Sequence, residues 1–393
     1  MTSTRHETNS VSQKSTSISE AISLSANRAL SAFEGKLETD GSYGKDAKDI
    51  ACHFKSPMMW IAAGSPDYAQ KMLTHIKSTF MLPNGDFGNN AQTKSVKPEY
   101  IEYWSYMNGW IIRAANKLGM ADISEPASQY LDQYRIGANS GFVTANISNH
   151  SKVSDVLTAS HHGLINLEAG NLETALSAGN YLCDAINNQP AIEHGFYLRI
   201  DGTGNPITQF SSEQTPFYFV SKHEADQLHF MIGYPSAYLA MLFKRTLDKK
   251  YLKAAQKYFD FSLSCNESVY ACNFSHKVAW AASVLLEITG EEKYLDAIEK
   301  ITTHFIKNQS ADGMWYADAD INTRYDQSAE IACWFMAIYK NINDFKKKFA
   351  LSGNDNSHHS SHRSLWTTQD TAFPSPKEKQ ATPKETNNKM KLN

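Results

Sequence analysis

Two carboxylates one helical turn apart are the residues of this chain whose types and spacing most clearly point to chemistry. Asp326 and Glu330 stand four residues apart in a helical pattern, so their side chains share one face of the helix. An acid at a helix start is often only a cap, because its charge favours the positive end of the helix. Capping does not account for the second carboxylate, so we expect the pair to belong to an acid–base site.

Ionisable and aromatic residues recur at the starts of other predicted helices. If these starts meet around one cavity, acids and imidazoles can transfer protons there, and aromatic rings can contact a substrate. Capping by each Asp, and helix packing by the aromatic residues, are the simpler interpretations. The predicted catalytic residues are Asp326, Glu330, Asp226, His229 and Asp155, and the predicted substrate-binding residues are Tyr103, Trp104, His162, Trp280, His276, Trp334 and Lys55.

A repeated unit supplies the elements that would bring these helix starts together. A helical pattern ends repeatedly in a short loop that contains Gly and then an aromatic residue. Such loops end at Tyr43, Phe87, Phe142, Phe196 and Trp315, and a degenerate copy without Gly ends at Tyr270. Repeats of roughly 40 to 55 residues indicate a solenoid or a closed array of helix pairs. Six pairs predict an all-α (α/α)6 toroid, in which the inner helices begin at one mouth.

The helical patterns alternate between the outer and the inner members of the pairs. Outer helices are expected at 19–33, 65–81, 125–135, 171–188, 250–264 and 291–308, and inner helices near Pro57 and at 98–118, 153–167, 224–246, 275–289 and 326–340. Strand-like residues on both sides of Asp-Gly-Thr-Gly predict a β-hairpin near Phe196–Phe210. We expect one toroid at 18–345, flanked by polar disordered segments at 1–17 and 346–393.

Composition narrows the class of protein. The chain of 393 residues has a formal net charge of −3 and 41% hydrophobic residues, which is typical of a soluble globular protein. The balanced charge gives no basis for binding nucleic acid, and no apolar run is long enough to span a membrane. Five scattered cysteines without a C-x-x-C pair favour a cytoplasmic protein. No feature requires a metal or an organic cofactor; a small molecule is the expected partner, and the oligomeric state is left open.

The last repeat resembles a known family in its motifs. Residues 326–330, Asp-Gln-Ser-Ala-Glu, resemble the Asp-Cys-Thr-Ala-Glu motif of oxidosqualene cyclases. The preceding segment KITTHFIKNQSADGMW is similar to the Gln-Trp repeat of that superfamily. The resemblance to the toroids of terpenoid cyclases and protein prenyltransferases covers residues 19–342 in architecture and only this unit in motif. It implies that Asp326 is the acid that donates a proton.

Several features depart from that family. The chain has room for one helical domain, whereas triterpene cyclases have two. The Asp-x-Asp-Asp motif of hopene-type cyclases is absent, and Gln327 replaces the Cys that follows the Asp in sterol cyclases. The Asp-x-Cys zinc motif of prenyltransferases and the Cys-His-Gly zinc residues of lanthionine cyclases are missing as well, despite Cys52-His53. A zinc-dependent reaction is therefore not expected.

These observations predict an enzyme that acts by acid catalysis. A carboxylic acid buried in an apolar cavity resists ionisation and can protonate an alkene, epoxide or carbonyl group. We expect a cyclase, isomerase or (de)hydratase that acts on an unsaturated isoprenoid- or polyketide-like molecule. The alternative is a carbohydrate-active (α/α)6 enzyme, a hydrolase, lyase or epimerase, that uses paired carboxylates from inner helices. A second alternative is a helical-repeat protein that binds a partner without catalysis.

Overall fold

The computed structural model describes residues 2–137 and 141–354, and the side chains of 13–137 and 141–348. The chain divides into two units, Met1–Ala350 and Leu351–Asn393. The first unit is built almost entirely from α-helices, and its described residues contain only two small sheets of two strands each. No helix in the described part of the chain is long and apolar enough to cross a membrane.

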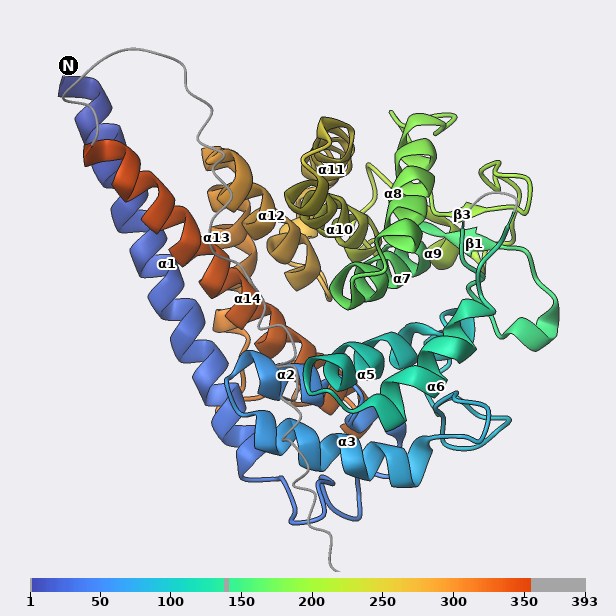
Figure 1. Ribbon diagram of the computed structural model, residues 1–393. Helices are drawn as coiled ribbons and strands as arrows, with labels where there is room; N and C mark the ends of the chain where they lie inside the picture. Colours follow the sequence, from blue (N-terminus) through green and yellow to red (C-terminus); the bar gives the residue numbers. More distant parts are fainter. Residues whose placement is uncertain (1, 138–140, 355–393) are drawn as a thin grey trace, which may run out of the picture. The chain divides into compact units, whose positions relative to one another are not determined.

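Six helix pairs form the first unit, as the repeats predicted (Figure 1). In each pair an outer helix, polar on one face, leads into an inner helix that is largely buried; α14 becomes buried only from its second turn. The outer helices are α1 (Thr2–Glu34), α3 (Pro66–Phe80), α6 (Ala121–Asp132), α8 (Leu172–Asn187), α11 (Lys249–Leu263) and α13 (Glu292–Lys307). The inner helices are α2 (Ser56–Ala62), α5 (Tyr106–Lys117), α7 (Val156–Ala169), α10 (Phe230–Thr246), α12 (His276–Thr289) and α14 (Ile321–Asn354).

Three of the five repeated Gly loops make a common contact with the outer ring, and the loops with Gly141 and Gly195 do not. Gly41, Gly85 and Gly313 have φ angles of 86°, 87° and 91°, in the left-handed region that glycine adopts most readily. A Cβ atom at any of them would collide with the backbone of an outer helix, which is α3 for Gly41, α6 for Gly85 and α1 for Gly313. The sequence pattern therefore reflects a backbone-to-backbone contact that only glycine permits.

The last loop also closes the ring, because α13 packs against α1. The Ser25 hydroxyl of α1 donates to the Gln309 side-chain oxygen at 2.8 Å, and the Gln309 amide donates to the Ser25 carbonyl at 2.9 Å. The Trp315 indole N–H donates to the Phe305 carbonyl at 2.8 Å and fixes the loop on α13. Near the middle of α1, Lys346 donates to the Ser19 hydroxyl at 3.0 Å, and α14 runs alongside α1 (Figure 1).

Several helix boundaries differ from the prediction. The first helix was expected to start at Ser19 and instead begins at Thr2, because Lys14 pairs with Asp296 and Glu299 of α13 at 2.5 and 2.8 Å. The polar composition of this segment concealed that packing. The last helix continues to Asn354 rather than ending at 340, and residues 355–393 of the expected tail lie outside the described residues. The domain boundaries 1–17, 18–345 and 346–393 stay predictions.

Two predicted inner helices are shorter than expected. The predicted helix at 98–118 is broken into α4 (Glu99–Glu102) and α5, because Tyr103 leaves the helical conformation with φ −127° and ψ 59°. The predicted helix at 224–246 begins only at Phe230, because Asp226 has a φ of 55°.

The predicted hairpin forms only in part. The turn after Ile200 is present, and Ile200 bridges Pro206 across it. The strands before the turn pair with more distant residues: β3 (Arg199–Ile200) pairs with β1 (Ser154–Asp155), and β2 (Gly195–Tyr197) pairs with β4 (Phe219–Ser221). These pairings hold the segment with the turn against the start of α7, beside the mouth at which the inner helices begin.

Candidate active site

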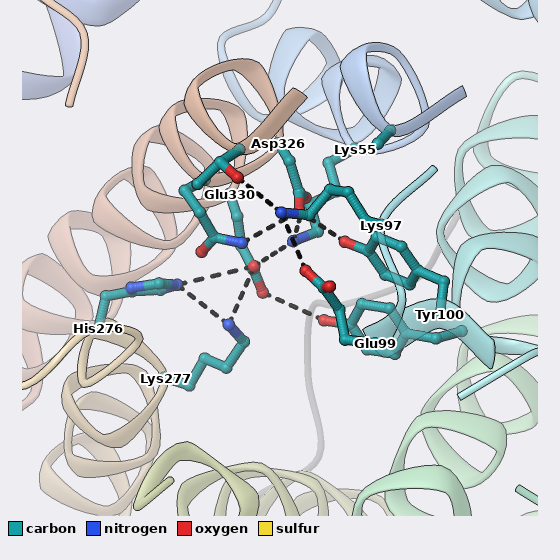
Figure 2. Close-up of polar contacts among 12 residues, drawn as sticks. Lys55, Lys97, Glu99, Tyr100, His276, Lys277, Asp326 and Glu330 are labelled. Carbon is teal, nitrogen blue, oxygen red and sulfur yellow. Dashed lines mark hydrogen bonds and ion pairs between the residues drawn. The ribbon is translucent and has the colours of Figure 1, made fainter. Parts of the chain in front are cut away.

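Four charged side chains meet inside the ring at the starts of three inner helices (Figure 2). Lys55 precedes α2, Lys277 lies in the first turn of α12, and Asp326 and Glu330 lie on α14; each side chain is at most 3% exposed. The Lys55 ammonium lies 2.5 Å from an Asp326 oxygen and also pairs with Glu330. Lys277 lies 2.9 Å from the same Glu330 oxygen that Lys55 contacts. Two positive and two negative charges thus form one buried, neutral cluster.

Neutral donors complete the hydrogen bonding of both carboxylates. The Tyr100 hydroxyl donates to Asp326 Oδ2 at 2.5 Å, and the Gln327 amide donates to the same oxygen at 3.1 Å. Glu330 Oε1 accepts from the Tyr106 hydroxyl and from the Trp334 indole N–H, both at 3.2 Å. Hydrogen bonds and ammonium groups around a carboxylate favour its charged form.

Charge coupling within the cluster shifts the pKa values of its members. Burial disfavours ionisation of Glu330, but the charges of Lys277 and Lys55 outweigh burial and hold its pKa well below the usual value. Burial likewise opposes the charge on Lys55, yet Asp326 and Glu330 raise the pKa of this lysine. Burial lowers the pKa of Lys277 to about 8, with Glu330 opposing the shift and Lys55 adding to it. Lys277 is therefore the cluster lysine that most readily loses its proton.

Asp326 owes its position to the cluster and not to capping. The structure starts α14 at Ile321, five residues before the expected start at Asp326. The capping carboxylate is Asp320, which accepts from the backbone N–H groups of Asn322 and Thr323 at 2.9 and 3.1 Å. Asp326 therefore lies in the second turn of α14, where its carboxylate is free to pair with Lys55.

A cavity of about 230 Å³ lies against one side of the cluster. Aromatic and aliphatic side chains form most of its wall, and its polar residues are Lys55, Lys277, Tyr100, Gln327 and Glu99. Neither Asp326 nor Glu330 lines it. Glu99 pairs with Lys97 at 2.9 Å and is 41% exposed, which places it at the rim open to solvent. The apolar lining residues are Tyr103, Tyr106, Leu157, Phe217, Leu228, Phe230, Met231 and Phe274.

A larger cavity, of about 660 Å³, lies among residues towards the ends of the inner helices. Trp280 and Trp334 both line it, and their rings stack with centroids 3.9 Å apart. Since Trp334 also donates to Glu330, it separates this cavity from the cluster. Arg113, a buried residue that lines the larger cavity, is paired with Glu168 at 2.8 Å. The smaller cavity is the better candidate for an active site, because the two cluster lysines line it.

The structure brings together about half of the residues predicted for the site. Lys55, Asp326, Glu330, Trp334 and His276 belong to the cluster or touch it, and Tyr103 lines the cavity. The nearer ring nitrogen of His276 lies 3.8 Å from Glu330 and 3.3 Å from the Lys277 ammonium. Burial lowers the pKa of His276 to about 3, so the imidazole is neutral in the folded protein.

Other predicted residues lie apart from the cluster and the cavity lining, and their roles in the site stay predictions. Asp155 caps α7 by accepting the Thr158 N–H at 2.5 Å, and it lies 3.7 Å from Arg199. His162 contacts the Ser105 hydroxyl at 2.9 Å and stacks on Phe142, away from the cavity lining. Asp226 is exposed in the loop before α10. Trp104 donates to Asp86 at 2.8 Å, and His229 is buried with no hydrogen-bond partner on either ring nitrogen.

The sequence prediction missed Lys277, Tyr100, Tyr106 and Gln327. Lys277 directly follows His276, so its place in the first turn of a predicted inner helix was a signal that could have identified it. Both tyrosines belong to the aromatic segment from which Tyr103 and Trp104 were chosen, and the unforeseen break at Tyr103 changes which of its faces point inward. The described residues contain no group of three or more His, Cys, Asp or Glu side chains arranged to hold a metal.

Solved structures share this architecture across most of the chain. D-mannose isomerase superposes with a TM-score of 0.59 and 12% identity, covering 82% of this chain and 97% of its own. A family 76 glycoside hydrolase (mannosidase) from Bacteroides thetaiotaomicron superposes with a TM-score of 0.58 and 13% identity, covering 82% of this chain and 99% of its own. The type II terpene cyclase MstE from Scytonema superposes with a TM-score of 0.53 and 12% identity, covering 83% of this chain and 99% of its own. No protein-family model and no curated protein matches the sequence.

These neighbours are all (α/α)6 toroid proteins, and the first unit of this chain has that fold. The architectural part of the predicted resemblance is confirmed, since a terpene cyclase is among the neighbours. At 12 to 13% identity the likeness extends to the fold alone, because sugar-processing enzymes and a terpene cyclase superpose comparably well. The function must therefore be argued from the cluster and its cavity.

Proposed function

We propose that this protein is an enzyme that moves a proton on a small, mainly apolar, unsaturated molecule and thereby isomerises it. Cyclisation and the gain or loss of water are related outcomes of the same proton transfer. The observation that carries the proposal is the contact between a buried, neutral ion cluster and a mainly aromatic cavity. Aromatic walls bind an apolar skeleton, and the cluster supplies groups that exchange protons without bulk water.

The cluster provides both a proton acceptor and a proton donor. Tyr100 lines the cavity and donates its hydroxyl proton to Asp326, so it can pass a proton taken from the substrate on to that carboxylate. Lys277 lines the same cavity as an ammonium with a lowered pKa, and it can return a proton at another carbon. Asp326 therefore acts here as the base behind Tyr100, whereas the sequence resemblance implied a direct acid.

The carbohydrate alternative draws less support from the site. Hydrolysis of a glycosidic bond generally needs two carboxyl groups that flank the bond. Only one carboxylate, Glu99, is among the lining residues, while Asp155 is used as a cap and Asp226 is exposed. A sugar also needs many hydrogen-bond partners, and most of this wall is aromatic or aliphatic. Nothing about the closed ring specifically favours a binding protein without catalysis.

The test is a conversion assay that compares wild-type protein with Asp326→Asn and Tyr100→Phe. Panels of isoprenoids, polyketide-like molecules and oligosaccharides are incubated with each protein, and products are separated and weighed by mass spectrometry. We expect the wild type to give a product of unchanged mass, or one changed by a single water, from an isoprenoid or polyketide-like compound. Each variant should lower the rate by at least about 100-fold, as removal of a general acid or base does.

A matched control is Asp318→Asn, which removes an exposed carboxylate from the loop before α14 and should leave the rate unchanged. Full activity in both Asp326→Asn and Tyr100→Phe would overturn the assigned roles. Cleavage of oligosaccharides by the wild type would instead establish the carbohydrate alternative.

A further inference from the structure

Of the two described lysines that line the cavity, Lys277 is the one with a single carboxylate partner. It is 3% exposed, it lines the cavity, and its ammonium lies 4.8 Å from the ring centre of Phe230 and 5.1 Å from that of Phe274. Its charged partner is Glu330, at 2.9 Å, and the ring nitrogen of His276 lies at 3.3 Å. A lysine held among aromatic rings and beside a second ammonium is the setting in which an amine becomes a nucleophile.

We propose that Lys277 forms an imine with the carbonyl carbon of a small aldehyde or ketone bound in the cavity. This inference rests on the proposed function and names its substrate class, a carbonyl compound whose apolar part contacts the aromatic wall. An imine makes the neighbouring C–H bonds more acidic, which is the property that proton transfer by Tyr100 and Asp326 requires. For such a substrate Lys277 holds the imine, and Tyr100 both takes the proton and returns it.

The step balances with the lysine, the carbonyl compound and solvent at the rim of the cavity. The ammonium of Lys277 loses a proton to solvent, and the free amine forms a C–N bond to the carbonyl carbon while one N–H proton moves to the carbonyl oxygen, which becomes a hydroxyl. The C–O bond then breaks and the hydroxyl leaves as water with a proton taken back from solvent. The net change is ammonium plus carbonyl to protonated imine plus water, so no oxidant or reductant is consumed. Hydrolysis of the imine releases the product and restores the lysine.

Two other buried lysines show why Lys277 is singled out. Lys55 also lines the cavity, but it pairs with both Asp326 and Glu330, and its pKa is raised, so it stays an ammonium. Lys94 has a pKa lowered by burial to about 8, as Lys277 has, but it does not line the cavity. Lys94 instead contacts Asp86 and Asn108, both at 2.5 Å. It is therefore an internal control for reactivity that arises from burial alone.

The experiment traps the imine in the full-length protein by reduction. Protein is incubated with benzaldehyde and sodium cyanoborohydride, digested, and mapped by mass spectrometry for N-benzyl lysine. We expect Lys277 to be modified at least tenfold faster than Lys94 and Lys55. The rate should rise with a midpoint near pH 8, the pKa of Lys277, and not near the ordinary lysine value of 10.5.

Acetylacetone gives a second readout that needs no reductant, because its enaminone with a neutral lysine absorbs in the near ultraviolet. The signal should appear in the wild type and be lost in Lys277→Arg, which keeps a cation beside Glu330 and whose folding is checked by circular dichroism. The proposal is overturned if Lys277 is unmodified, if Lys94 reacts equally fast, or if the rate rises only near pH 10.5.

Failure of this inference can be told apart from failure of the proposed function. If wild-type protein isomerises a substrate that lacks a carbonyl group and Lys277 traps nothing, the imine is wrong and the proton-transfer function stands. If Lys277 traps carbonyl compounds but Asp326→Asn and Tyr100→Phe convert substrates at the full rate, the imine stands and the assigned proton relay is wrong.

Discussion

Lys55 balances the charge of two buried carboxylates that no solvent reaches. Asp326 and Glu330 both pair with it, and only Glu330 has a second ammonium partner, Lys277. Removing one member of a buried ion pair leaves an uncompensated charge, which costs about 3–5 kcal/mol. We expect Lys55→Met to lower the free energy of unfolding by that amount, measured by urea denaturation at pH 7.5. The matched control is Lys77→Met on the surface, where the pair with Asp122 is largely exposed and should contribute less than about 1 kcal/mol.

Charge balance also predicts how a second substitution acts. Asp326→Asn, added to Lys55→Met, removes the carboxylate that depends most on Lys55, so the double variant should be more stable than the sum of the two single losses predicts. Strict additivity would show that the cost of Lys55→Met arises from lost packing. A loss as small as that of Lys77→Met would show that the cluster is open to water.

At the scale of the elements, the contact between Gly313 and α1 holds the ring closed. An alanine there would adopt the left-handed φ of 91° and also press its Cβ against the Arg28 carbonyl. Gly119 has a φ of 67°, but no atom lies within 4 Å of a Cβ at that position, so Gly119→Ala reports the backbone strain alone. That strain is about 1–2 kcal/mol. Overpacking adds about 1–3 kcal/mol, so Gly313→Ala should be less stable than Gly119→Ala by that margin in urea denaturation.

Equal losses in Gly313→Ala and Gly119→Ala would contradict the role of this loop in ring closure. The Ser25–Gln309 hydrogen bonds lie beside the same contact. Because Gly119 lies in the turn after α5, its substitution leaves those bonds intact, and the comparison isolates the closing contact.

The elements could be predicted because their signals are local. Helical periodicity and the Gly loops identified six helix pairs, and the left-handed φ of Gly41, Gly85 and Gly313 explains the glycine in three of those loops. The boundaries were harder, because they depend on distant partners. Lys14 pairs with α13, and α1 therefore extends further towards the N-terminus than predicted. The left-handed φ of Asp226 delays the start of α10. Neither feature is encoded in the neighbouring residues.

The site could be predicted only where one helix carried it. Asp326 and Glu330 share a face of α14, and spacing alone identified them. Lys277 and Tyr100 come from other elements, and their relation to the acids depends on how the inner helices turn about their axes. The direct-acid role for Asp326 was argued from an apolar environment and stays a prediction. The contacts of Lys55 and Tyr100 with its two oxygens could not be read from the sequence pattern, because both residues come from other elements.

For the molecule as a whole, burial of neutral histidines is a shared property of the ring interior. Five buried histidines have lowered pKa values, and desolvation is the main cause of the shift in each of them. It lowers the pKa to about 4 for His53 and His229, to about 3 for His162 and His276, and well below the ordinary 6.5 for His161. All five are buried. As the pH falls below 6.5, the unfolded chain takes up protons at these positions that the folded protein does not bind.

Stability should therefore fall on acidification, starting well above the pKa values of ordinary carboxyl groups. Each histidine that is protonated only in the unfolded state lowers the free energy of unfolding by about 1.4 kcal/mol per pH unit. With five such groups we expect a loss of up to about 10 kcal/mol between pH 6.5 and 4.5, measured by urea denaturation at half-unit steps. Asp155 opposes this trend, because burial raises its pKa and the folded protein binds its proton more readily. One opposing carboxyl cannot offset five imidazoles.

His229→Phe is the sharpest test of that account. Neither ring nitrogen of His229 has a hydrogen-bond partner, so phenylalanine removes the titrating group while keeping an aromatic ring and breaking no hydrogen bond. The slope of the unfolding free energy against pH should fall by about 1.4 kcal/mol per pH unit between pH 6 and 4.5, which is the contribution of one proton. His194→Gln, at a side chain that is 73% exposed, should leave the slope unchanged. An unchanged slope in His229→Phe would mean that acid acts at other groups in this pH window, because the contribution of Glu330 fades only at lower pH.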